Sequence, residues 1–433
     1  MTASCGGDPT PSPTQELPAS LFDVSDGSED VTAADVVPVL DTVTIPDTGP
    51  DVDGAGDQDT STPGTDAAQG ADAVVAEDTA SAPWTDPAVW FVHISDTHLD
   101  GAGGRAAQQL AYVLSEVMPA VSPVALLHTG DLVDDGGAGE QWAAYDAVMA
   151  AAPAYPETLE LVGNHDKKND GGDDWLAHAL TGRAGQGFLG QHFYETPAGR
   201  VRVVRADTSD SSWNATNVVG FYSDEQHALL TALQVEGPPP VATLLLGHHP
   251  MTGLGAMSLL GSGDRMRALM ARVGAAAYLC GHVHEPELAE LDGVAVVQAP
   301  SLGKAGLVSR TMGFALVALD AGRPVARVVT LDTEATPAMA WPLVMRLRPE
   351  DVPPTYPAGT SIEVRALAFA PQGILRVEAR IDGGPWVSLA GDGAGRFRGV
   401  LPPRWVPGGA TIEVQAVSPE GVSVDSLRVV VAP

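Results

Sequence analysis

The sequence predicts a layered α/β domain followed by an all-β domain, with a long acidic segment in front of both. Short runs rich in Val and Leu alternate with helical patterns from about residue 84 onward, which is typical of a layered α/β domain. Over roughly the last hundred residues, strand-like segments and turn signals alternate without any helical pattern. Residues 1–82 show neither pattern and contain seventeen acidic residues without a single Lys or Arg.

The first segment, residues 1–82, is predicted to be a disordered acidic linker or tether. It is rich in Asp, Thr, Pro, Gly, Ala and Ser and has almost no aromatic residues. A chain of high charge and low hydrophobicity buries too little apolar surface to offset the entropy lost on ordering. Like charges also repel one another and extend such a segment.

Cys5 lies in Ala3-Ser4-Cys5-Gly6, which resembles the end of a bacterial lipoprotein signal, although the basic and apolar regions of a signal peptide are missing. Our hypothesis is a lipid anchor at Cys5 and a location in the cell envelope or outside the cell. The alternative is an ordinary exposed cysteine in a cytoplasmic protein. The other cysteine, Cys280, ends an apolar run, and no disulfide between the two is expected.

The overall charge limits the possible partners. The chain has 55 acidic residues against 23 Lys and Arg, which gives a formal net charge of −32. Such a field repels nucleic acid and anionic lipid, so no nucleic-acid partner is expected. No apolar run approaches the roughly 18 residues that a membrane-spanning helix needs, so a membrane contact is expected only through the lipid anchor.

The α/β domain is predicted to span residues 83–335. Strands are expected at 90–94, 124–127, 159–162, 241–246, 275–280, 294–298, 314–319 and 325–331. Helices are expected at 105–117 and 141–151, and a third begins after Ser223, where Ser223-Asp224-Glu225-Gln226 forms a capping box.

The last domain is predicted to span residues 336–433. Its segments 361–369, 374–381, 396–400, 411–417 and 426–431 alternate apolar and polar residues, with Gly-rich turns between them. Short strands at regular spacing predict an immunoglobulin-like β-sandwich. The cysteine pair of antibody domains is absent from these segments, so only the architecture is predicted.

Five of the apolar runs end in groups that can bind metal ions. These groups are Asp96-Thr97-His98, Gly130-Asp131-Leu132-Val133-Asp134, Gly163-Asn164-His165-Asp166, Gly247-His248-His249-Pro250 and Gly281-His282-Val283-His284. Any one of them alone is more often a turn. Since the carboxyl ends of the strands in an open α/β sheet meet at one crevice, five in succession predict a single site. Mixed imidazole and carboxylate ligands suit Fe, Mn or Zn.

In order and spacing, these groups resemble the signature of the calcineurin-like metallophosphoesterases, D-x-H, G-D-x-x-D, G-N-H-[DE], an isolated His and G-H-x-H, over residues 88–305. The resemblance implies a four-layer αββα sandwich with two metal ions about 3.5–4 Å apart. It assigns Asp131 as the ligand that bridges both ions. The remaining ligands would be Asp96, His98 and His284 for one ion, and Asn164, His248 and His282 for the other. The added C-terminal domain is similar to one branch of the family.

The same resemblance assigns His165 as the catalytic histidine, which stabilises the transferring phosphoryl group and protonates the leaving oxygen. Asp134 would orient His165 or a ligand imidazole. Asp166 would either do the same or cap the following turn, and His249 would point away and pack beside Pro250. The substrate-binding residues are unknown. Lys167 or Lys168 would contact substrate phosphate or belong to a solvated loop.

The resemblance therefore implies a phosphoesterase in which a metal-bridging hydroxide attacks phosphate monoesters or diesters. One alternative is a non-catalytic surface binding or scaffolding protein whose metal domain is structural. A nuclease is the weakest alternative, because the sequence has neither a basic track nor an aromatic platform.

Overall fold

The computed structural model describes residues 87–152, 157–209, 219–251, 259, 261–306, 308, 310–332, 337–347 and 355–433. The predicted tether (residues 1–82), Cys5 and the predicted domain boundary at 335/336 lie outside these residues. They stay predictions.

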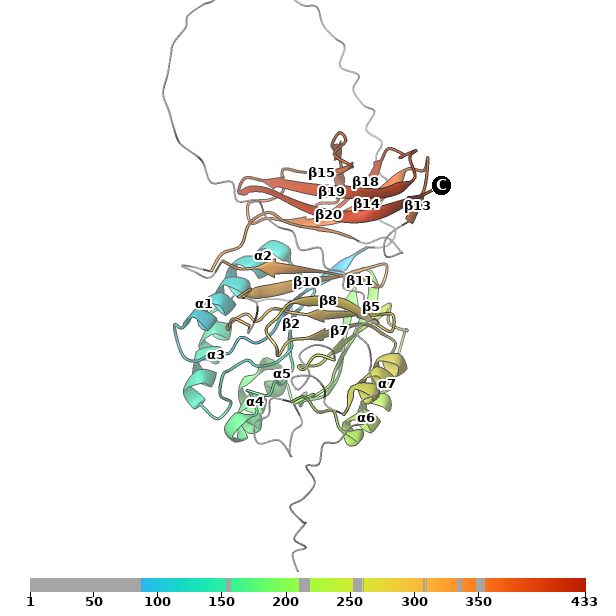
Figure 1. The fold of residues 1–433 in the computed structure, drawn as a ribbon. Helices are drawn as coiled ribbons and strands as arrows, with labels where there is room; N and C mark the ends of the chain where they lie inside the picture. Colours follow the sequence, from blue (N-terminus) through green and yellow to red (C-terminus); the bar gives the residue numbers. More distant parts are fainter. Residues whose placement is uncertain are drawn as a thin grey trace, which may run out of the picture. The chain divides into compact units, whose positions relative to one another are not determined.

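Two β-sheets carry the predicted α/β region (Figure 1). The first has the order β11-β10-β1-β2-β3. Its strands are β11 (Arg323–Thr330), β10 (Gly313–Asp320), β1 (Val89–Ile94), β2 (Leu126–His128) and β3 (Thr158–Glu160). Strands β1, β2 and β3 are parallel, and β10 and β11 extend the sheet antiparallel on the other side of β1.

The second sheet has the order β4-β5-β6-β7-β9-β8. Its strands are β4 (Gly190–Thr196), β5 (Gly199–Arg205), β6 (Ala242–Leu246), β7 (Ala275–Cys280), β9 (Val294–Gln298) and β8 (Glu287–Leu291). The four inner strands are parallel, and the two edge strands β4 and β8 are antiparallel to their neighbours.

Helices cover the outer face of each sheet. They are α1 (Arg105–Tyr112), α2 (Met118–Val121), α3 (Gly139–Ala151), α4 (Gly172–His178), α5 (Leu180–Arg183), α6 (Asp224–Thr231) and α7 (Gly263–Val273), with a π-helical turn η1 (Val113–Val117) and a 3₁₀ turn η2 (Lys168–Asp170). Figure 1 shows α1, α3 and α4 on one side and α6 and α7 on the other.

The buried cores confirm the predicted four layers. Side chains alternate along a strand, so successive residues face opposite sides of a sheet. In β1, Phe91 packs against the second sheet, in a core with Leu244 and Leu279. Its neighbours Trp90 and Val92 face the helical side instead. In the second sheet, Leu245 and Tyr278 pack on α6 and α7. The order of layers is therefore helix, sheet, sheet, helix.

The C-terminal residues form two further sheets, as the alternating pattern predicts. One has the order β12-β14-β18-β17, with β12 (Leu343–Arg346), β14 (Ile362–Phe369), β18 (Arg396–Leu401) and β17 (Ala390–Gly391). The other has the order β13-β20-β19-β15-β16, with β13 (Thr355–Pro357), β20 (Gly421–Ala432), β19 (Gly408–Ser418), β15 (Arg376–Ile381) and β16 (Val387–Ser388). Val364 of one sheet and Val414 of the other belong to one shared core. The region is thus all-β, while the immunoglobulin-like classification stays a prediction.

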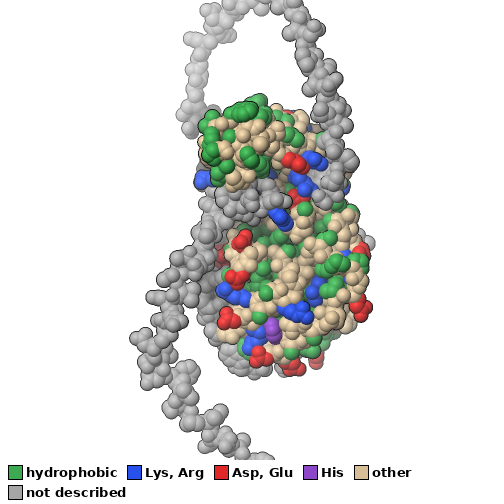
Figure 2. Space-filling model, turned by 90° about the vertical axis from the view of Figure 1, so that its right-hand side faces the viewer, with side chains coloured by type: hydrophobic (Ala, Val, Ile, Leu, Met, Phe, Trp, Pro, Cys, Tyr) green, Lys and Arg blue, Asp and Glu red, His purple; other side chains and the backbone are tan. Residues whose placement is uncertain are grey.

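The surface is mixed on the face shown in Figure 2. Lys and Arg side chains are interspersed with Asp and Glu on this face, and apolar side chains gather over the C-terminal sheets. The exposed apolar residues of this region include Trp405 and Val406, between β18 and β19, and Val422 of β20. Among the described residues, no helix is both long and apolar enough to cross a membrane.

Candidate metal centre

The predicted site is built from loops that follow five parallel strands. Strands β1, β2 and β3 supply the first three groups, and β6 and β7 of the other sheet supply the last two. The loops contact one another through their backbones: the Asp96 amide donates to the Gly130 carbonyl (3.0 Å), and the Gly281 amide donates to the His248 carbonyl (2.9 Å). The His282 amide donates to the Asp96 carboxylate across the two sheets (2.9 Å). Both sheets therefore end at one buried site.

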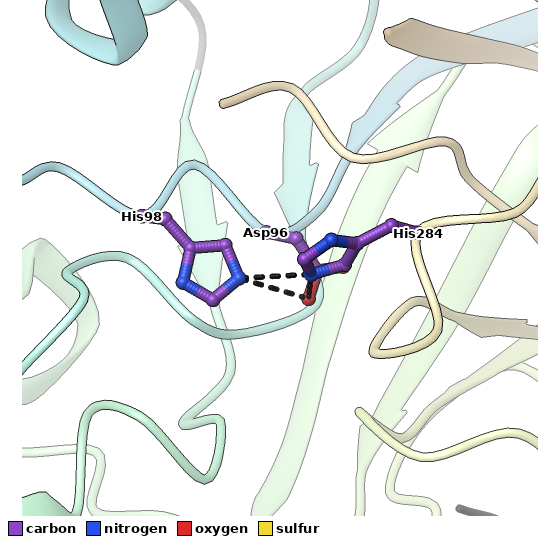
Figure 3. A group of neighbouring side chains, drawn as sticks. All are labelled: Asp96, His98 and His284. Atoms are coloured by element: carbon purple, nitrogen blue, oxygen red, sulfur yellow. Dashed lines mark hydrogen bonds and ion pairs between the residues drawn. The ribbon is translucent and has the colours of Figure 1, made fainter. Parts of the chain in front are cut away.

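Asp96, His98 and His284 form the first group of converging side chains (Figure 3). The Nε2 atoms of the two histidines lie 2.9 Å apart. Asp96 Oδ1 lies 3.7 Å from His98 Nε2 and 3.4 Å from His284 Nε2. Atoms that bind one metal at about 2.1 Å are roughly 3.0–3.4 Å apart. These spacings are therefore close to those of a shared ion.

Asp131, His248 and His282 form the second group, together with the Asn164 amide. His248 Nε2 lies 3.3 Å from Asp131 Oδ2 and 3.0 Å from Asn164 Oδ1. His282 Nδ1 lies 2.9 Å from the same Asn164 oxygen. The structure thus places the side chains of all seven expected ligands close together, grouped as the family resemblance implies.

A single oxygen of Asp131 connects the two groups. Its Oδ2 lies 3.6 Å from His98 Nε2 in the first group and 3.3 Å from His248 Nε2 in the second. The other oxygen, Oδ1, accepts the backbone N–H of His165 (2.8 Å), which fixes the orientation of the carboxylate. Asp131 therefore occupies the position that a bridging ligand needs.

The backbone is strained at the ligands themselves. Five of the ten non-glycine residues with positive φ among the described residues are predicted ligands, namely Asp96 (53°), His98 (45°), Asp131 (56°), His282 (72°) and His284 (62°). Such conformations are costly for residues with a Cβ and concentrate at functional sites. Gly163 is needed for a different reason, because a Cβ there would lie 2.2 Å from Asp131 Oδ1.

The electrostatics of the site favour a bound cation. Burial alone would raise the pKa values of Asp96 and Asp131, but the neighbouring imidazoles hold both well below their usual range. Burial alone would lower the pKa of His248, but the neighbouring Asp131 carboxylate outweighs burial and raises this pKa to about 9. Two buried carboxylates thus demand positive charge beside them, which metal ions supply when imidazole ligands are neutral.

One buried ligand atom also lacks an ordinary hydrogen bond. Asp96 Oδ1 is buried and has no hydrogen-bond donor among the described residues, although two imidazole nitrogens point toward it. A buried polar atom without a partner is costly unless an ion or water satisfies it. The donor set of carboxylate, imidazole and amide oxygen fits divalent metal ions.

Asp134 and His165 lie beside the first group. Asp134 Oδ1 is 3.2 Å from His98 Nδ1 and 3.2 Å from His165 Nδ1. The contact with His98 lowers the pKa of Asp134, burial opposes this, and Lys304 lowers it further. Asp134 therefore orients a predicted ligand and the predicted catalytic histidine at once, and the imidazole of His165 remains partly exposed, with 22% of its side chain accessible.

Asp166 does neither of the two things that the sequence suggested. Its Oδ1 accepts the backbone N–H groups of Leu132 (2.8 Å) and Val133 (3.1 Å), and its Oδ2 accepts that of Gly163 (2.8 Å). Asp166 thus ties the second loop to the third. His249 also differs from expectation, because its ring lies 4.1 Å from that of His282 and its Nδ1 contacts Thr208 Oγ1 (3.1 Å).

Sequence reasoning missed the loop after β5. Thr208 Oγ1 accepts the backbone N–H groups of His248 and His249 (3.0 Å each), so it holds the fourth loop in place. Asp207 is buried and pairs with Lys167 at 2.5 Å. The signal was Ala206-Asp207-Thr208 after an apolar strand, but Arg200, Arg202 and Arg205 interrupt that strand in the sequence.

A family model matches the part of the chain that contains most of this site. Residues 89–286 match the family model described as calcineurin-like phosphoesterase. No curated protein matches the chain significantly.

Several solved structures resemble part of this chain. The GAP50 anchor of the inner membrane complex of Plasmodium has a TM-score of 0.42 at 14% identity, over 57% of this chain and 86% of that one. A purple acid phosphatase from yellow lupin has a TM-score of 0.42 at 13% identity, over 58% and 52%. The phosphopantetheinyl hydrolase of Mycobacterium tuberculosis has a TM-score of 0.33 at 16% identity, over 49% and 89%.

Proposed function

With a calcineurin-like phosphoesterase domain at residues 89–286, we propose that this chain is a hydrolase of phosphate esters that works with two metal ions. The observation that carries the proposal is the position of Asp131 Oδ2, within 3.6 Å of a ligand nitrogen in each of the two groups. Bound metal ions would activate water as a nucleophile and polarise the phosphate oxygens.

The residues of the chain have separate tasks in this proposal. One ion would be held by Asp96, His98, His284 and Asp131, and the other by Asp131, Asn164, His248 and His282. Fe, Mn and Zn all suit these ligands. The loops with positive φ would hold the ligand side chains in place before any ion binds, so metal binding would cost little conformational entropy.

His165 is proposed as the proton donor to the leaving oxygen. Its Nδ1 lies 2.7 Å from the Asp134 carbonyl and 3.2 Å from the Asp134 carboxylate, which together hold the ring in one orientation. A histidine held in this way transfers a proton with the geometry that general acid catalysis needs. Because the ring is partly exposed, a leaving group can approach it from the solvent side.

The proposal is tested by hydrolysis of p-nitrophenyl phosphate and bis-p-nitrophenyl phosphate. Protein loaded with Mn, Fe or Zn would be compared with Asp131→Asn. Asp292→Asn is the matched control, because Asp292 is an exposed residue with nearly the same φ (53° against 56°). The proposal predicts metal-dependent turnover that is lost in Asp131→Asn and retained in Asp292→Asn.

The preferred ester separates a monoesterase from a diesterase. If metal-loaded protein hydrolyses neither ester, the proposal is wrong for these substrate classes. In that case, the non-catalytic binding protein becomes the better account.

A further inference from the structure

The chain has only three lysines, and all three lie at the proposed active site. Lys167 and Lys168 follow the third loop, and Lys304 follows β9. The chain as a whole has a net charge of −32, so three ammonium groups around one site are notable. Lysines beside a catalytic site can bind anions there, provided that their ammonium groups are not already neutralised by carboxylates.

Lys167 is committed to the fold. Its Nζ lies 2.5 Å from the buried Asp207 carboxylate and 4.8 Å from the centre of the Phe188 ring. An ammonium that is paired with a buried carboxylate is not available to a ligand without leaving that charge unpaired. Lys167 therefore holds the loop after β5 against the third loop.

Lys304 is placed by a short turn that docks on the first loop. Ser301 Oγ donates to the Asp96 carbonyl (2.7 Å), the Gly303 amide donates to the same carbonyl (3.0 Å), and the Lys304 amide donates to Ser301 Oγ (2.9 Å). This turn brings the ammonium into contact with Asp134 Oδ1. The Lys304 side chain remains 43% exposed, so only part of the ammonium is used.

Lys168 lies on the other side of Asp134. Its Nζ donates to the Asp134 carbonyl (3.3 Å) and lies beside the imidazole of His165, 3.0 Å from Nε2. Among the described residues, no carboxylate pairs with Lys168, whereas Lys167 and Lys304 each have one. Each ammonium has three N–H donors. Lys304 uses one of them on Asp134 and keeps the others for a ligand, whereas Lys168 directs its donors at the Asp134 carbonyl and at both ring nitrogens of His165, so it contributes a positive charge that no carboxylate in the described part of the chain neutralises.

We propose that Lys168 and Lys304 form a subsite for a second anionic group of the substrate. Two ammonium groups flank the Asp134 carboxylate, which is already shared with His98 and His165, so neither ammonium has this carboxylate to itself. This inference rests on the proposed function, because His165 marks where the leaving group departs. The substrate class is then a phosphate ester whose leaving group carries its own anion, such as a carboxylate or a further phosphate.

Binding of non-hydrolysable analogues tests this subsite without relying on turnover. Phenylphosphonate would be compared with 3- and 4-carboxyphenylphosphonate, which differ from it only by the second anion. Isothermal titration of metal-loaded protein would give the affinity ratio for the wild type, the double variant Lys168→Gln/Lys304→Gln and a control. Arg267→Gln is the control, because it removes an exposed cation on α7 that pairs with Asp292.

The wild type should bind at least one carboxylated analogue about tenfold more tightly, because partly exposed charge-assisted hydrogen bonds contribute roughly that factor. The ratio should fall to about one in the double variant, stay unchanged in Arg267→Gln and shrink in high salt. A second double variant, Lys168→Gln/Lys304→Arg, keeps one of the two charges and should recover part of the preference for the carboxylated analogue.

Three outcomes would overturn the subsite. They are a wild-type ratio near one, a ratio that the double variant leaves unchanged, and an equal loss of affinity for all three analogues. The last would show that the lysines bind the phosphoryl group itself. Failure of the proposed function would look different, since it would appear as absent ester hydrolysis whatever the analogue affinities are.

Discussion

Replacing Gly303 by Ala should destabilise the protein and impair the proposed metal site from a position outside the ligand set. A Cβ at Gly303 would lie 1.8 Å from the Thr97 carbonyl oxygen and 2.6 Å from its carbon. A carbon–oxygen contact needs about 3.3 Å, so one backbone must move by roughly 1.5 Å. Thr97 lies between two predicted ligands, Asp96 and His98, and the displacement acts on both.

The magnitude follows from the contacts that the turn makes. Overpacking a rigid site costs about 1–3 kcal/mol. The shift would also break the hydrogen bonds from Gly303 to Asp96 and from Leu302 to Ser95, both 3.0 Å long, at about 1 kcal/mol each. The expected loss is about 3–5 kcal/mol, or a fall in Tm of about 6–10 °C at about 2 °C per kcal/mol for a domain of this size.

The assay is thermal unfolding of the metal-loaded protein, followed by hydrolysis of p-nitrophenyl phosphate. Gly139→Ala is the matched control, since it begins α3 and its added Cβ would meet no atom within 4 Å. The control should keep its Tm and activity. If Gly303→Ala unfolds within about 2 °C of the wild type and keeps its kcat/KM, the docking of this turn on the first loop is wrong.

Three further predictions concern Asp134, Glu160 and the bound metal ions. Asp134→Asn should lower kcat about 10- to 100-fold while metal content is retained, because a neutral amide orients His98 and His165 less strongly; unchanged kcat would contradict this. Burial raises the pKa of Glu160 to about 6 from its ordinary 4.5. The folded protein therefore binds this proton more tightly than the unfolded chain does, and the free energy of unfolding falls as the pH rises from about 4.5 to above 6. Glu160→Gln should remove a decrease of about 2 kcal/mol in unfolding free energy between pH 4 and 7.5, and denaturant titrations that show the same pH slope in both proteins would refute it. Chelation of the metal should lower Tm and abolish turnover, with both restored by Mn²⁺, because Asp96 and Asp131 then lose the cation that offsets their charges; a Tm that is insensitive to chelator would contradict this.

Much of the fold was predictable because burial leaves a local signature. Strands β1, β6 and β7 are almost entirely apolar, with His93 and Thr243 as exceptions, since each strand is covered on both faces. The hairpin of β4 and β5 has no such signature. Arg202 and Arg205 lie in β5 yet are buried, and Arg205 donates to the Gly187 carbonyl (2.8 Å), so charged residues occupy strand positions that the pattern reserves for apolar ones.

The first helix ended later than its pattern predicted. The apolar spacing indicated an end at residue 117, just before Met118-Pro119. In the structure, the chain instead continues through the π-helical turn η1 into α2, which ends at Val121. Proline is tolerated at the first turn of a helical segment because its missing N–H would be unpaired there.

The ligands were predictable and their surroundings were not. Each of the five ligand groups follows a strand of its own, so the order of the groups along the chain indicated the site, and the family resemblance supplied the ligand assignments. Lys304 and Thr208 act through loops that dock across the two sheets, and no local pattern records which loops meet. His249 lies against His282 for the same reason.

The most direct test of a site shared by two metal ions is the number of ions bound per chain. Metal-free protein would be titrated with Mn²⁺ while bound metal is measured by mass spectrometry and p-nitrophenyl phosphate hydrolysis is followed in parallel. The account predicts two ions per chain, activity that requires both, and weaker binding of both in Asp131→Asn, since that carboxylate lies between the two groups. Full activity with a single ion, or two ions bound equally tightly by Asp131→Asn, would contradict it.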